Sequence, residues 1–166
     1  MVLHLISSSG TGATLRLAKI FSDNMVLQKG VSVPIWGTAE PNKKVTVEFA
    51  DQKVETRSNN LGKWRLKLQP LGVSNDSRVF KVFSGKQMFS IKNVVVGEVW
   101  FSGGQSNMGY STGAMAGRLE LARNLVSKAN YPDIRFRKVT DTNSSKPKDD
   151  LGGGSWFVCD SNSVKA

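Results

Sequence analysis

The pattern of apolar and polar residues changes character near residue 93. From Leu15 to about Lys92, apolar and polar positions alternate with a period of two, and turn residues such as the 59–62 run Asn-Asn-Leu-Gly interrupt them. This alternation is typical of antiparallel strands that turn one face toward a core and the other toward water. Seven or eight short strands at this spacing predict an antiparallel β-sandwich over residues 14–92.

The second half has longer apolar runs. Val94 to Phe101 is almost continuously apolar, as expected of a strand buried on both faces. Apolar residues at helical spacing predict an amphipathic helix over about 118–129, and 134–139 predicts a second strand. This order predicts a β-α-β unit with parallel strands and a right-handed crossover. We therefore expect a mainly β chain with a partial α/β region over 93–166.

Residues 1–13 form a short segment that we expect to be frayed. Its apolar part follows no basic residue and is shorter than the ~7–15 residues of a signal-peptide core. No segment approaches the ~20 apolar residues of a membrane-spanning helix, so we expect no membrane partner. The localisation stays open.

Composition narrows the classes of partner. The 166 residues carry a net charge of +10, which favours anionic partners. The Lys and Arg residues alternate along the predicted strands rather than gathering in runs, which favours a solvated basic surface over nucleic-acid binding. Cys159 is the only cysteine, so neither an internal disulfide nor a thiolate metal site is expected. No other cluster has metal-ligand spacing, and we expect no metal and no cofactor.

Ser106 is the candidate for chemistry. An apolar strand that leads into Gly103-Gly104 and then into small polar residues can expose a nucleophile. A serine hydroxyl also needs a base to take its proton and donors to receive an oxyanion. The Ser106 amide is one possible donor, and we expect Gly104, Gln105 and Asn107 to support the turn.

The base is the missing part. The one histidine, His4, lies far upstream in the frayed segment, where a surface role is favoured over a catalytic one. Acidic residues after Ser106 offer an orienting carboxylate but no proton acceptor suited to neutral pH. The motif also differs from a Gly-x-Ser-x-Gly elbow, because Met108 occupies its last position.

Two strings of residues resemble a known family. Gly97-Glu98-Val99-Trp100 and Gly104-Gln105-Ser106-Asn107-Met108 are similar to the first block of the sialate O-acetylesterase family, within the SGNH hydrolases. The resemblance extends from about Leu15 to the C-terminus through further strings at 21–28, 33–37, 39–41, 62–64, 129–135 and 153–156.

The resemblance implies a serine esterase that removes O-acetyl groups from sugars, with sialic acid or acetylated plant polysaccharide as substrate classes. It implies a β-sandwich beside a flavodoxin-like α/β domain, with Ser106 as the nucleophile, and a secreted, periplasmic or lysosomal location. The family's acid and base come from a late Asp-x-x-His segment that has no counterpart here, so we expect this chain to be inactive alone. The chain also has Phe101-Ser102-Gly103 where the family commonly has Leu-Cys-Ser, and Gly109 where it has an acidic or amide residue.

Two other interpretations stay open. The 14–92 region could be a carbohydrate-binding or docking module, with Trp36 and Trp64 as a sugar platform, although core packing is the favoured role of both. Alternatively, the chain is a structural piece that associates through an exposed sheet edge. A second polypeptide could also supply the histidine.

Overall fold

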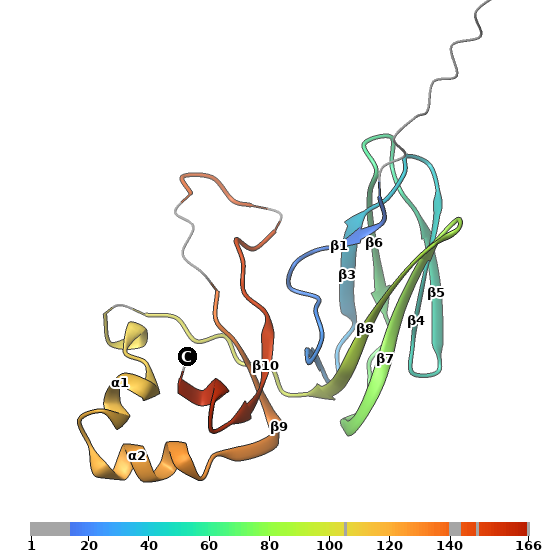
Figure 1. The fold of residues 1–166 in the computed structure, drawn as a ribbon. Coiled ribbons are helices and arrows are strands. Elements are labelled where there is room, and N and C mark those ends of the chain that lie inside the picture. Colours follow the sequence, from blue (N-terminus) through green and yellow to red (C-terminus); the bar gives the residue numbers. More distant parts are fainter. Residues whose placement is uncertain (1–13, 105, 140–143, 149, 166) are drawn as a thin grey trace, which may run out of the picture.

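The computed structural model describes residues 14–104, 106–139, 144–148 and 150–165 (Figure 1). His4, Gln105, Asp141 and Asp149 lie outside the described residues. Side chains at Asn107 and Met108 are likewise not described.

Residues 14–97 form two β-sheets. One sheet has the order β1-β3-β6, and the other has the order β2-β8-β7-β4-β5. All recorded neighbours pair antiparallel except β2 and β8, which run parallel, so the five-stranded sheet is mixed. The strands are β1 Arg16–Leu17, β2 Val26–Gln28, β3 Val33–Thr38, β4 Lys44–Phe49, β5 Gln52–Arg57, β6 Lys63–Leu68, β7 Ser74–Ser84 and β8 Gln87–Gly97.

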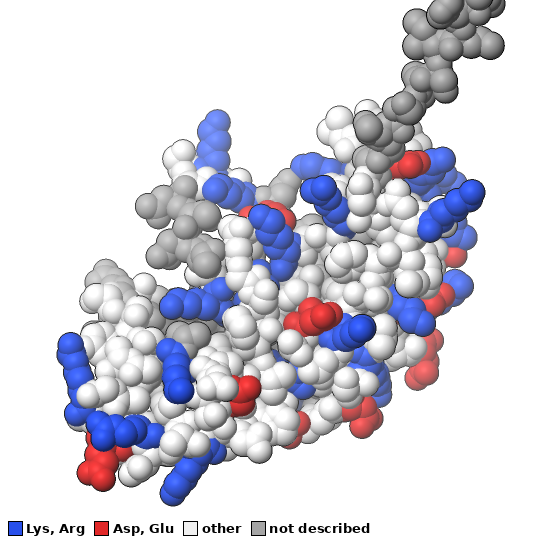
Figure 2. Space-filling model, viewed as in Figure 1, with Lys and Arg blue, Asp and Glu red and all other residues white. Residues whose placement is uncertain are grey.

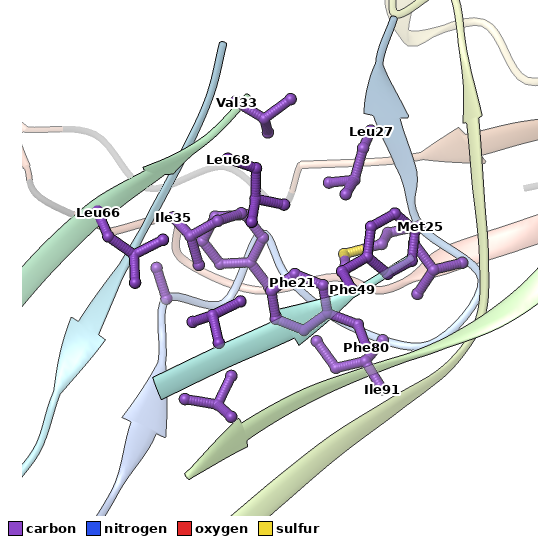
Figure 3. Close-up of a cluster of buried hydrophobic side chains, with 14 of the residues drawn as sticks. Phe21, Met25, Leu27, Val33, Ile35, Phe49, Leu66, Leu68, Phe80 and Ile91 are labelled. Carbon is purple, nitrogen blue, oxygen red and sulfur yellow. The ribbon is translucent and has the colours of Figure 1, made fainter. Parts of the chain in front are cut away.

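The two sheets share one hydrophobic core (Figure 3). Along β4, the side chains of Val45, Val47 and Phe49 are buried while their neighbours in sequence are not. Strand β6 alternates in the same way. The period-two pattern of the first half is therefore confirmed as a set of strands, because each inward residue packs against the opposite sheet.

One glycine lets a short strand approach closely. A Cβ atom at Gly37 in β3 would collide with the carbonyl oxygen of Arg16 in β1. Leu17 is the register partner of Gly37 in the same pair of strands. The missing side chain therefore allows β1 to join the edge of the three-stranded sheet.

The C-terminal part contains the remaining elements and one further pair of strands. They are η1 Ser106–Gly109, α1 Thr112–Ala116, α2 Glu120–Ser127, β9 Asn130–Arg137, β10 Trp156–Asp160 and η2 Ser163–Lys165. Strands β9 and β10 pair antiparallel as a two-stranded sheet. Helix α1 follows its N-cap residue Ser111, whose side chain accepts a hydrogen bond from the Ala114 amide.

The predicted parallel β-α-β unit is wrong. The apolar run at 94–101 is divided, because Val94–Val96 complete β8 between β2 and β7, and the strand ends at Gly97. Beyond it, Trp100 and Phe101 are 84% and 96% exposed. Strand β9 pairs with β10 rather than with the 94–101 segment. A parallel pair is stable mainly when helices cover both of its faces, whereas an antiparallel pair can leave one face in water.

The predicted helix forms but does not bury its whole apolar side. Val126 of α2 is buried, whereas Leu121 and Leu125 are exposed. No helix in the described part of the chain is long and apolar enough to cross a membrane. The proposed domain boundary at 92/93 stays a prediction; β8 runs through this position without a break.

Candidate functional site

The segment that leads to Ser106 is held by the end of β2. Strands β2 and β8 pair parallel, with Gln28 opposite Gly97. The Lys29 amide donates to the Gly97 carbonyl oxygen at 2.9 Å, which extends this pairing by one residue. The Gln28 side chain then accepts from the Val99 amide at 2.8 Å and donates to Glu98 at 3.2 Å. Two of the strings that carry the family resemblance are thus joined through one glutamine.

An ion pair between Glu98 and Lys29 also holds the start of this segment against the end of β2. The Glu98 carboxylate lies 3.1 Å from the Lys29 ammonium group, and both side chains are about half exposed. The hydrogen bond from Lys29, followed by that from Gln28, lowers the pKa of Glu98 below its ordinary value. Glu98 therefore stays ionised at neutral pH and acts as an anchor for the segment rather than as a proton donor.

Residues 98–104, which lead toward Ser106, are all exposed. Phe101 folds back toward Gly103, so that a Cβ atom there would lie 3.3 Å from the Phe101 ring. Gly103 does not adopt a left-handed conformation, so its missing side chain provides room for this ring rather than a special backbone turn. Gly104 is exposed beside it.

Ser106 begins the 3-10 helix η1 and is exposed. Its hydroxyl has no hydrogen-bond partner among the described residues. The expected support by Gly104, Gln105 and Asn107, like the oxyanion role of the Ser106 amide, stays a prediction.

Two of the described carboxylates that follow Ser106 are hydrogen-bonded to other groups. Asp160 accepts from the amides of Asn162 and Ser163, and these bonds, the one from Ser163 first, lower its pKa. Asp150 accepts from the Lys19 amide at 2.8 Å. Glu120 lies in the first turn of α2. Within the described residues, then, no base is hydrogen-bonded to Ser106, and no group of three or more His, Cys, Asp or Glu could hold a metal.

The two tryptophans proposed as a sugar platform pack inward. Trp64 is 3% exposed and belongs to the core. Trp36 packs against that core and meets the Phe21 ring edge-on, with centroids 4.9 Å apart. A buried ring cannot stack on a sugar, so the platform prediction is wrong for Trp64, and core packing explains both residues.

Basic residues do not form a single patch on the face shown in Figure 2. Lys and Arg side chains are spread over it, with acidic residues among them. Some are paired across strands, as Lys44 is with Glu55 and Lys53 with Glu48. On this face, the described residues do not form the massed basic surface that is typical of a nucleic-acid interface.

Comparisons of sequence and of structure both find acetylesterases as similar proteins. Over 163 residues, 91% of the chain, it is 27% identical to the sialate O-acetylesterase of Pongo abelii. The identities with the Mus musculus and Homo sapiens sialate O-acetylesterases are 28% and 26% over the same share of the chain. Its structure matches that of a carbohydrate acetylesterase from Xanthomonas citri with a TM-score of 0.84 and 26% identity, over 92% of this chain.

The chain is therefore similar, in sequence and in structure, to the sialate O-acetylesterase family. It spans about a third of these relatives' length, 30–31% of the sialate O-acetylesterases and 34% of the Xanthomonas citri chain. No family model matches it.

Sequence reasoning missed the residues that hold this family's motifs together. In the sequence, Gln28 is only the last residue of the similar string at 21–28, and the structural roles of Asn24 and Asn93 are not predicted. Both asparagines have positive φ, 67° and 55°. The residue type is the available signal, because asparagine tolerates the left-handed conformation better than most side chains.

Proposed function

We propose that this chain carries the nucleophile of a carbohydrate esterase that hydrolyses O-acetyl esters on sugars. The observation that carries the proposal is the position of Ser106, eight residues beyond the Gln28–Glu98–Lys29 anchor, in a chain similar to sialate O-acetylesterases over 91% of its length. The acetylated sugar, as sialic acid or as a polysaccharide unit, is the proposed substrate.

The reaction would proceed by acyl transfer. The Ser106 oxygen attacks the acetyl carbonyl carbon while a base takes the hydroxyl proton, and the carbonyl oxygen becomes an oxyanion. The base then returns the proton to the sugar oxygen as the ester bond breaks. In the second half of the reaction, water that is deprotonated by the same base attacks the acetyl carbon on Ser106, and the base returns this proton to the Ser106 oxygen as acetate leaves.

We propose the finer architecture on the same basis. Residues 14–92 are assigned to a β-sandwich domain, supported by the shared core of the two sheets. Residues 93–166 are assigned to part of an SGNH-type α/β hydrolase domain, supported by the resemblance of the strings at 97–100 and 104–108.

The proposal includes inactivity of these 166 residues alone, because no histidine follows Ser106. Aryl acetate should be hydrolysed by the purified chain no faster than by buffer. The Ser106→Ala variant and a Ser102→Ala control should give the same background. Hydrolysis that is lost in Ser106→Ala but kept in Ser102→Ala would overturn the inactivity and leave the nucleophile assignment standing.

A chimera tests the nucleophile itself. The chain is joined to the part of the Mus musculus sialate O-acetylesterase that it does not cover, which supplies the candidate base. We expect acetyl ester hydrolysis that disappears in Ser106→Ala and persists in His4→Ala. A folded chimera that stays active without Ser106 would refute the assignment.

A further inference from the structure

A cavity of about 320 Å³ lies between the core sheets and the β9–β10 pair. Its walls are the 21–24 segment that precedes β2, the 89–91 segment of β8, and Ser155 with Trp156 at the start of β10. This volume is at the lower end of the range for small-ligand sites, about 300–1,000 Å³. From the geometry and chemistry described below, we infer that this cavity binds a single neutral sugar unit of a glycan.

Aromatic rings form the apolar part of the wall. Trp156 donates its indole N–H to the Ile20 carbonyl oxygen at 2.8 Å, and Phe21 is held against Trp36. Both rings are therefore fixed before a ligand arrives, which lowers the entropy cost of binding. Phe89, 41% exposed, is the ring that a ligand can still cover. Phe21 is a core residue, 8% exposed, so the exposed Phe89 ring is the one that provides apolar surface for the C–H face of a sugar.

Polar groups surround these rings. One carboxylate oxygen of Asp23 accepts from the Lys92 amide at 2.7 Å, which orients the side chain. The other oxygen, and the hydroxyls of Ser90 and Ser155, have no hydrogen-bond partner among the described residues. They supply acceptors and donors for the hydroxyl groups of a sugar.

The edge of β8 adds main-chain groups. On the side away from β7, β2 pairs only with Val95–Gly97 of β8. Residues 88–91 therefore have no strand partner on that side among the described residues, and three consecutive ones line the cavity. Amide and carbonyl groups at such an edge are available to a ligand.

The charge of the wall selects the class of sugar. Among the described residues that line the cavity, Asp23 has the one ionisable side chain and none is Lys or Arg, although the whole chain carries +10. A carboxylate at the site repels an acidic sugar such as sialic acid. The inference rests on the proposed carbohydrate function for the kind of ligand, but it does not involve Ser106.

The test is a titration of the ¹⁵N-labelled chain, followed at the Trp156 indole N–H. The neutral probes are methyl β-xyloside and methyl β-glucoside, and the acidic probe is the methyl glycoside of N-acetylneuraminic acid. We expect weak, saturable binding of a neutral probe, with a Kd on the order of 1 mM, and weaker binding of the acidic probe.

Variants locate the binding. Phe89→Ala should weaken it by about tenfold or more, whereas Phe89→Tyr keeps the ring and the affinity. Met88→Ala is the matched control, since Met88 is 61% exposed on the same strand and does not line the cavity. Asp23→Asn keeps an acceptor for the Lys92 amide and should reduce the preference for neutral over acidic sugar. Ser106→Ala should leave the titration unchanged, so binding can succeed even if the proposed esterase function fails.

Three results would overturn the inference. One is the absence of any shift at Trp156 with either neutral probe up to about 50 mM. Another is equal binding by Phe89→Ala and the unmodified chain, with both spectra those of a folded protein. The third is an acidic probe that binds as tightly as the neutral ones.

Discussion

The side chain of Asn93 donates a hydrogen bond of 2.7 Å to the side-chain oxygen of Asn24. Asn24 in turn donates to the Trp156 carbonyl oxygen at 3.4 Å, and Asn93 accepts from Arg135 at 3.3 Å. These bonds connect the core sheet to both strands of the β9–β10 pair. The Arg135 guanidinium is partly buried, and this desolvation lowers its pKa.

Replacing Asn93 separates its two contributions. Asn93→Ala removes both side-chain hydrogen bonds and leaves an alanine at φ 55°, where its Cβ atom is strained. Asn93→Gly also removes the hydrogen bonds, but glycine adopts this φ without strain. We expect Asn93→Ala to lower the free energy of unfolding by roughly 2–3 kcal/mol, and Asn93→Gly by about 1 kcal/mol less. Urea denaturation measures both.

Asn60→Ala is the control for this comparison, because Asn60 is exposed in a turn. It should change stability by no more than about 0.5 kcal/mol. Equal losses from the alanine and glycine variants of Asn93 would mean that its backbone conformation adds nothing.

Most strands of the first half could be predicted, because a strand with one buried face shows its burial directly in the sequence. In β6, Trp64, Leu66 and Leu68 are buried and the residues between them exposed, and this is the period-two signal itself. The alternation within each strand shows which residues face the core, so these strands can be predicted without knowing which strands they pair with.

The second half could be predicted less well, because pairing depends on residues far apart in the sequence. The apolar run at 94–101 has the composition of a single buried strand, yet Val96 is 1% exposed and Phe101 is 96% exposed. Nothing in the run itself shows that Gly97 ends the strand. The Gln28 contacts to Glu98 and Val99 span about 70 residues and have no periodicity, so only the structure reveals them.

Removing the Gln28 side-chain amide should loosen the segment that leads to Ser106. Gln28→Leu deletes the acceptor for the Val99 amide, and we expect that amide to exchange with solvent several-fold faster. Gln52→Ala is a matched control, since Gln52 makes similar bonds to the backbone of Gln69 elsewhere. Hydrogen exchange by NMR measures both variants. Unchanged exchange at Val99 in Gln28→Leu would show that the contact does not hold this segment.

The ion pair of Glu98 predicts a dependence of stability on acid. Lys29 lowers the pKa of Glu98 below its ordinary 4.5, so the unfolded chain binds the proton more readily. The stabilisation is therefore present above about pH 4.5 and is lost as the pH falls through the lower, folded value. Glu98→Gln should flatten the decline of stability in this window.

A direct titration of the Glu98 carboxyl by NMR checks the cause. Lys29→Met should move its pKa back up toward the ordinary value, whereas Lys86→Met, in the turn between β7 and β8, should not. Added salt should also weaken the effect, because both partners are about half exposed. A pKa that stays low in Lys29→Met would exclude the ion pair as its main cause.

Trp100 and Phe101 should make the chain associate at high concentration. They are adjacent and 84% and 96% exposed, beside the proposed nucleophile segment. Two neighbouring aromatic rings in water favour contact with another apolar surface, because their burial removes a large apolar area from solvent. The double variant Trp100→Ser/Phe101→Ser should reduce the association seen by sedimentation velocity, with little change in the free energy of unfolding. Leu61→Ser, which replaces a single 76% exposed apolar residue in a turn, is the control and should associate like the unmodified chain. If the double variant associates as strongly, the contact must lie elsewhere. The outer edges of the β9–β10 pair, which pair with no other described strand, are the next surface to test.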